Sequence, residues 1–177
     1  MPRSEIDLNP VQHITVDAIG QPGHRVFYIQ GWRADDIQPV TIIIEKIQLQ
    51  TLAAGLEQML AEAAHQNPAL TGPAEAYDAD KMRISPPVDP LFRAGEMGLG
   101  YDTEQDLIVI LVREILAEGG DPEEASVVRF WCTRQQSAWL AAWSTEVVQR
   151  GRPICPQCGQ PMEPEGHFCP KKNGHKH

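Results

Sequence analysis

The five residues 40–44, Val-Thr-Ile-Ile-Ile, restrict the fold of this chain more than any other segment. Branched side chains occupy both alternating faces, as in a strand that is covered on both sides within a sheet. From Gln48 onward the apolar spacing becomes helical, and Asn67 and Pro68 end that pattern near His65. We therefore expect an interior strand followed by an amphipathic helix. The apolar side of this helix consists of Leu49, Leu52, Ala53, Leu56, Leu60 and Ala63.

Strand-like segments lie on both sides of this unit. Residues 14–19 and 26–29 are β-prone and are separated by the turn sequence Gly-Gln-Pro-Gly, which predicts a hairpin. Residues 92–101 and 107–112 predict a second antiparallel pair, because only a short polar stretch separates them.

Glycines alternate with larger side chains in the first strand of that second pair. Gly98 and Gly100 fall on one face, and Met97, Leu99 and Tyr101 fall on the other. A strand face without side chains admits a neighbouring element closely or helps to shape a groove. We expect close packing and keep the groove as the alternative.

The last part of the body predicts one more strand and a second helix. Residues 125–132 alternate regularly, and Thr133 and Gln136 have the spacing of a capping box that begins a helix. Because the strands are joined by short connections, we expect an α+β fold with a mainly antiparallel sheet, two packed helices and a C-terminal zinc-knuckle tail. Residues 1–150 would form the core domain and residues 151–177 the tail.

Residues 66–90 interrupt the regular pattern. They contain five prolines with acidic residues between them and show no sustained periodicity. We interpret the segment as a long loop, which is either a plain connection or a recognition element.

Composition and charge indicate a globular protein in an aqueous compartment. Hydrophobic residues make up 42% and charged residues 22% of the chain, and no apolar run is long enough to span a bilayer. The net charge is −9, although the tail carries four basic and two acidic residues. An acidic body repels phosphate backbones, so we expect a cytoplasmic protein without membrane contact and unlikely to bind nucleic acid.

The cysteines of the tail predict a metal site. Cys155 and Cys158 enclose Pro-Gln and are followed by Gly159, whose freedom to adopt a positive φ suits a tight chelating turn. Cys169 follows closely, and the sequence shows no export signal that would place it in an oxidising compartment, so we expect metal binding rather than disulfides. Three thiolates and one histidine would saturate a structural zinc ion.

Two histidines compete for the fourth position around that zinc ion. His167 lies two residues before Cys169, beside Gly166, whereas His175 lies close to the chain end. Because chain ends fray, we favour His167 and keep His175 as the alternative fourth ligand. We expect Cys132, which lies in an apolar context, to be a core residue, and we assign no catalytic residue.

Several segments together resemble the uncharacterised bacterial family catalogued as domain of unknown function 3090. The resemblance covers nearly the whole chain and is most specific in Gly166-His-Phe-Cys-Pro170 and Asn173-Gly174. It implies a single-unit protein without an established activity, and no catalytic residue can be transferred from it. The other segments are Gly23-His-Arg-Val-Phe-Tyr-Ile-Gln30, Glu45-Lys-Ile-Gln48, residues 92–102 and residues 151–159.

Three functions are compatible with these patterns. A non-enzymatic binding or scaffold protein with a protein partner is favoured, because no acid, base and nucleophile emerge as a set. An enzyme or enzyme subunit would need a polar site near the glycine-rich strand, where Glu45-Lys46 and Arg113-Glu114 would have to meet. A nucleic-acid contact would use the basic tail, through Phe168 beside Lys171 and Lys172.

Overall fold

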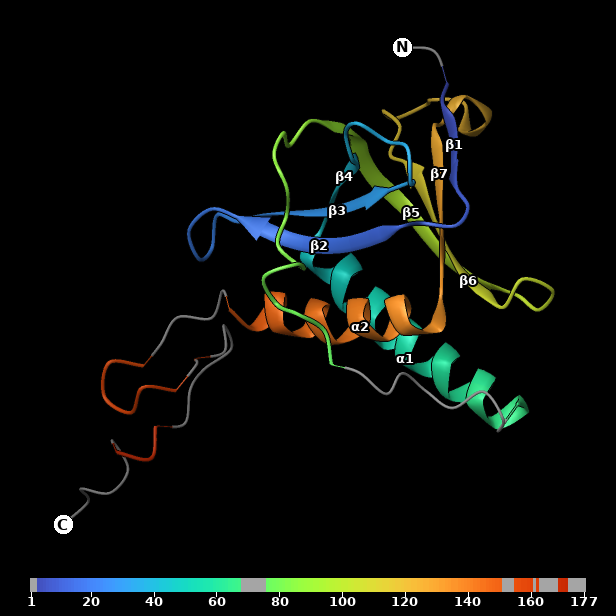
Figure 1. Ribbon diagram of the computed structural model, residues 1–177. Coiled ribbons are helices and arrows are strands. Elements are labelled where there is room, and N and C mark those ends of the chain that lie inside the picture. Colours follow the sequence, from blue (N-terminus) through green and yellow to red (C-terminus); the bar gives the residue numbers. More distant parts are fainter. Residues whose placement is uncertain (1–2, 68–75, 151–154, 161, 163–168, 172–177) are drawn as a thin grey trace.

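Strand β4 (Val40–Ile44) lies inside a single seven-stranded sheet, between β3 and β5, as its pattern of branched residues predicts. The computed structural model describes residues 3–67, 76–150, 155–160, 162 and 169–171 (Figure 1). The sheet order is β1-β7-β6-β5-β4-β3-β2. The other elements are β1 (Glu5–Leu8), β2 (His13–Ile19), β3 (Val26–Trp32), α1 (Lys46–Gln66), β5 (Pro90–Asp102), β6 (Leu107–Glu114), η1 (Pro122–Glu124), β7 (Val127–Cys132) and α2 (Arg134–Gln149).

The sheet is mainly antiparallel, which confirms the α+β prediction. Four strand pairs, β2–β3, β3–β4, β5–β6 and β6–β7, are antiparallel. Strand β4 pairs with β5 in parallel, and β1 pairs with β7 in parallel. Both predicted hairpins are therefore present, and helix α1 forms the crossover between the parallel strands β4 and β5.

Strand β1 is an element that the sequence did not predict. It has only four residues, and its outward side chains Glu5 and Asp7 are charged. Arg129 of β7 lies 3.6 Å from the Glu5 carboxylate and 3.5 Å from the Asp7 carboxylate. Asp7 also accepts a hydrogen bond of 3.2 Å from the indole nitrogen of Trp131. Long-range partners therefore stabilise a strand whose own sequence gives little signal.

Two helices lie together on one side of the sheet (Figure 1). The predicted capping box begins α2, where Thr133 Oγ1 accepts from the Gln136 amide at 3.1 Å and Gln136 Oε1 accepts from the Thr133 amide at 2.9 Å. The Trp143 side chain is fully buried, and its indole nitrogen donates to the Val16 carbonyl at 2.6 Å. This contact fixes α2 on strand β2.

The second half of the long loop is part of the packed body. Asp17 accepts a hydrogen bond of 3.0 Å from the Ile84 amide. The amide group of Gln30 both donates to the Ser85 carbonyl and accepts from the Ser85 amide, each at 3.0 Å. Thr15 donates to the Met82 carbonyl. The buried polar residues of β2 and β3 therefore hold residues 76–89, whereas residues 68–75 lie outside the described residues.

The glycines of β5 require a correction. A Cβ atom built on Gly98 or Gly100 would meet nothing within 4 Å, and neither residue has a positive φ. The expected close packing is therefore wrong for the described part of the chain, and these glycines leave open space instead.

The lone cysteine of the body, Cys132, is a core residue, as its apolar sequence context predicts. The Cys132 thiol is fully buried, and burial raises its pKa to about 12, as suits a core residue without nucleophilic character.

Among the described residues, neither helix combines the length and apolar character that crossing a bilayer would require.

Replacing Gln30 should loosen the loop that it holds. Gln30→Ala removes both hydrogen bonds to Ser85 and leaves a gap at a fully buried position. We expect the free energy of unfolding to fall by about 1–3 kcal/mol, measured by urea denaturation.

The matched control is Gln58→Ala, because Gln58 is exposed on α1 and its side chain bonds across the helix surface to Glu62 at 3.3 Å. This control should change stability by about 0.5 kcal/mol or less. Equal losses for the two variants would show that Gln30 does not hold the loop.

Candidate metal centre

A tight turn organises the first two cysteines of the tail. The Cys155 amide donates to the Gln160 carbonyl at 2.8 Å, and the Gly159 amide donates back to the Cys155 carbonyl at 2.8 Å. Gly159 has a φ of +73°, which residues with a side chain rarely adopt. The positive φ predicted from the Cys-Pro-Gln-Cys-Gly sequence is therefore confirmed.

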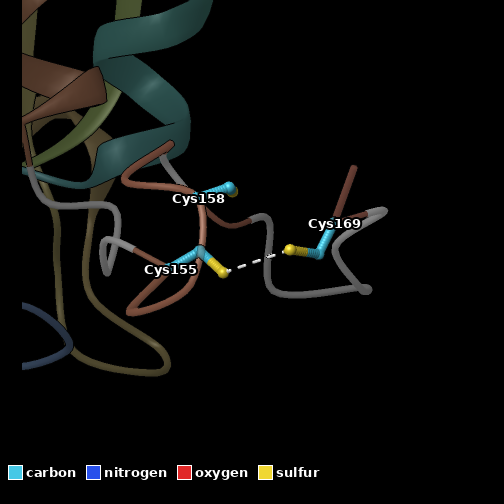
Figure 2. Close-up of side chains that lie close together, drawn as sticks. All are labelled: Cys155, Cys158 and Cys169. Atoms are coloured by element: carbon cyan, nitrogen blue, oxygen red, sulfur yellow. Dashed lines mark hydrogen bonds between the residues drawn. The ribbon is translucent and has the colours of Figure 1, made fainter. Parts of the chain in front are cut away.

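The three cysteines of the tail converge on one point. The sulfur atoms of Cys155, Cys158 and Cys169 all lie within 4.8 Å of one another. Figure 2 shows the Cys155 and Cys169 sulfurs facing each other, and they lie 3.8 Å apart. Both residues are only 5% exposed. Cys169 approaches the turn from further along the chain and completes a cluster of soft ligands, in which Cys155 and Cys169 are buried and Cys158 is partly buried.

This spacing fits one metal ion and does not fit a disulfide. Sulfurs bound to a tetrahedral zinc ion at about 2.3 Å lie about 3.8 Å from one another, whereas disulfide sulfurs lie about 2.05 Å apart. The separation of 3.8 Å between the Cys155 and Cys169 sulfurs is compatible with two ligands of one ion. Cys155, Cys158 and Cys169 are all free thiols.

The thiols of the cluster differ in acidity. Backbone amides of Cys158 and Gln157 lower the pKa of Cys155 to about 6, although burial opposes them. The Gln160 amide favours ionisation of Cys158, but burial and the neighbouring thiols of Cys155 and Cys169 raise its pKa overall. Without a cation, one sulfur therefore carries negative charge at neutral pH and hinders ionisation of the next. A bound metal cation would remove that obstacle.

The structure brings together the three predicted cysteine ligands, and both candidate histidines lie outside the described residues. The fourth position, His167 or His175, therefore remains a prediction. One nearby polar group was not foreseen: Gln157 Oε1 lies 3.7 Å from the Cys169 sulfur. The turn places this side chain there, and the spacing of the cysteines alone gives no signal for it.

The polar pairs considered for an enzyme site do not meet. Glu45 bonds to Arg93 at 2.6 Å, and Arg113 lies 3.6 Å from Glu96. Glu114 accepts instead from the Ser126 amide at 3.0 Å. In the described part of the chain, no ion pair or side-chain hydrogen bond joins Glu45-Lys46 to Arg113-Glu114.

Comparison with known proteins places the whole arrangement in one family. The family described as protein of unknown function, DUF3090, matches residues 6–169. The chain belongs to this family. The DUF3090 match spans both the sheet and the cysteine cluster, and it includes His167 but ends before His175. No curated protein and no solved structure matches the chain significantly.

The body should fold without the tail. Arg25 donates to the carbonyls of Val147 and Val148 at 2.9 and 3.3 Å, so the end of α2 is held from β3. Arg150 stacks 4.5 Å from the Trp143 ring and bonds to Glu146 at 2.8 Å. A chain that ends at Arg150 should therefore keep most of its secondary structure and a cooperative thermal transition.

Circular dichroism and tryptophan fluorescence of this truncated chain, compared with the full chain, provide the measurement. A shift of tryptophan emission toward that of exposed indole, or loss of the cooperative transition, would show that the tail belongs to the core. The boundary at residue 151 would then be wrong.

Proposed function

We propose that the chain is a non-enzymatic binding or scaffold protein whose tail is held by one structural zinc ion. The observation that carries the metal proposal is the convergence of three cysteine sulfurs within 4.8 Å on a tight turn. Cys155, Cys158 and Cys169 would supply three thiolates, and His167 the fourth ligand. A Cys₃His set is typical of tetrahedral structural zinc.

The choice of His167 is supported by the extent of the family match. That match ends at Cys169, so it contains one histidine of the pair and not His175. His167 is also tethered two residues from a cysteine that already lies in the cluster. Closing the site through His167 costs less chain entropy than recruiting a residue from the terminal segment.

A saturated zinc ion supports a structural role. Catalytic zinc keeps one position open for water or substrate, and four protein ligands leave none. Cysteines that bind metal and form no disulfide are typical of reducing compartments, which supports a cytoplasmic location. We therefore propose that the metal stabilises the fold of the tail and that the binding surface lies on the body.

An apolar groove on the body supports the binding role. It encloses about 360 Å³ between α1 and β5, and its lining includes Leu52, Met97 and Leu99. Ile47 lies at this groove with 67% of its surface exposed, and Gly98 leaves the space beside it open. An exposed apolar side chain beside a hollow is typical of a protein contact site. We propose that a partner protein places an apolar side chain there.

The zinc proposal predicts about one tightly bound zinc ion per chain. Elemental analysis of protein purified without added metal or chelator measures this content. Cys155→Ser combined with Cys158→Ser should abolish zinc retention, because two of the four ligands are lost. A metal content near zero in the unaltered chain, or full retention by the double variant, would refute the assignment.

The two histidines provide matched variants in the same assay. His167→Ala should lose much more zinc than His175→Ala, whereas the reverse order would transfer the fourth position to His175. Cys132→Ser is the control for removing a cysteine, since that thiol lies in the core. It should lower stability and leave the zinc content unchanged.

The binding role predicts a partner whose capture depends on Ile47. Tagged full-length chain, recovered from its own cells with its associated proteins quantified, should lose a specific partner about tenfold on Ile47→Glu. Ile37→Glu is the matched control, because Ile37 is 98% exposed and lies away from the groove. Equal capture by both variants, with unchanged melting temperatures, would exclude the groove as the contact site.

A further inference from the structure

A second cavity opens where strand β4 ends and helix α1 begins. It encloses about 280 Å³ and is separate from both the tail and the apolar groove in its lining residues. Its charged lining comes from three places in the chain: Arg25 just before β3, Glu45 and Lys46 at the start of α1, and Arg93 of β5. No local sequence motif predicts this grouping.

The cavity concentrates positive charge on an acidic protein. Three cations and one carboxylate give its lining a formal charge of +2, although the whole chain carries −9. Glu45 is engaged by Arg93 at 2.6 Å. Lys46 is half-buried and has no carboxylate within ion-pair distance in the described part of the chain. Positive charge in a concave site attracts and retains small anions.

Arg25 is held in a fixed orientation at this cavity. Its two terminal nitrogens donate to the Val147 and Val148 carbonyls, and its guanidinium lies 4.8 Å from the Phe27 ring centre. These contacts use two of the five N–H donors of the side chain, so others remain for a ligand. Burial lowers the pKa of Arg25, and attraction to Asp17 only partly offsets this. A preorganised cation binds an anion with little further loss of conformational entropy.

Backbone amide groups add to the positive electrostatic potential of this cavity. Lys46 is the first residue of α1, which has 21 residues. The Glu45 side chain caps the Gln48 amide, and the other amide groups of the first turn keep partial positive charge. Strand β4 and the next strand in the crossover, β5, are parallel. The carboxyl end of a parallel strand, beside a helix N-terminus, is a common location for anionic ligands in crossover units. Here that location coincides with the three cationic side chains.

We propose that this cavity binds a phosphoryl dianion, either free phosphate or the phosphate group of a small phosphomonoester. A phosphate ester carries about −1.5 to −2 charges at neutral pH, which balances the +2 of the lining. A monocarboxylate would leave one positive charge uncompensated. Guanidinium groups also match the geometry of phosphate oxygens through paired hydrogen bonds.

The test is calorimetric titration of the full-length protein, with its own metal, in a phosphate-free buffer at one fixed low ionic strength. The probes are inorganic phosphate, glycerol 3-phosphate and acetate. We expect saturable binding of the two phosphates, and acetate about tenfold weaker or worse. Tighter binding of glycerol 3-phosphate identifies an organic ester as the ligand class, and equal binding identifies free phosphate.

Variants assign that binding to the cavity. Lys46→Gln and Arg93→Gln should each weaken phosphate binding about tenfold. Arg33→Gln is the matched control, because Arg33 and Arg93 have side chains that are both 50% exposed and both paired with a carboxylate. Arg33→Gln should leave binding unchanged.

Glu45→Gln should act in the opposite direction. It removes the carboxylate that competes with phosphate for Arg93, so binding should tighten several-fold. Loss of folding cannot produce tighter binding, so this variant separates the site from a stability effect. Absence of saturable phosphate binding, equal weakening by Arg33→Gln, or weaker binding by folded Glu45→Gln would each overturn the proposal.

Discussion

The parallel pairing of β4 with β5 is the constraint on which the remaining architecture depends. Parallel neighbours cannot be joined by a tight turn, so the chain must leave one end of the sheet and return to the other. Helix α1 carries it away along one face, and residues 76–89 bring it back over β2 and β3, where Thr15, Asp17 and Gln30 bond to its backbone. The same crossover places the first turn of α1 at the carboxyl end of β4. One pairing choice therefore explains the long loop, the buried polar residues beneath it and the position of the cationic cavity.

Features encoded in local periodicity could be predicted from the sequence, and features that depend on distant partners could not. The branched pattern of 40–44, the capping box at Thr133 and the two hairpins are properties of adjacent residues, and the structure confirms them. Strand β1 depends on pairing with β7, about 120 residues away. Close packing is the commoner reason for glycines inside a strand, and the sequence of β5 therefore predicts it. Their surroundings are open, and only the fold reveals that.

The candidate sites divide in the same way. Two cysteines enclosing Pro-Gln, with a glycine after them, specify a tight turn within five residues, so the cysteine cluster was predictable apart from the contact with Gln157. The cavity at the start of α1 takes its cations from positions 25, 46 and 93. Glu45 and Lys46 are neighbours in the sequence, but the ion-pair partner of Glu45 is Arg93, which lies 48 residues away. Binding sites assembled across a sheet have no sequence signature until the strand order is known.

The contrast between an acidic body and one cationic cavity has a consequence for selectivity. Residues 1–150 carry 11 basic and 22 acidic residues, so a long polyanion such as a nucleic acid meets repulsion over most of the surface. A small dianion experiences that distant field only weakly at physiological salt, where the Debye length is about 8 Å, and it responds mainly to charges in contact with it. The cavity at Arg25, Lys46 and Arg93 supplies such charges. Repulsion at long range and attraction at short range together select for small phosphorylated ligands and against phosphate polymers. Such selectivity fits the binding role proposed above.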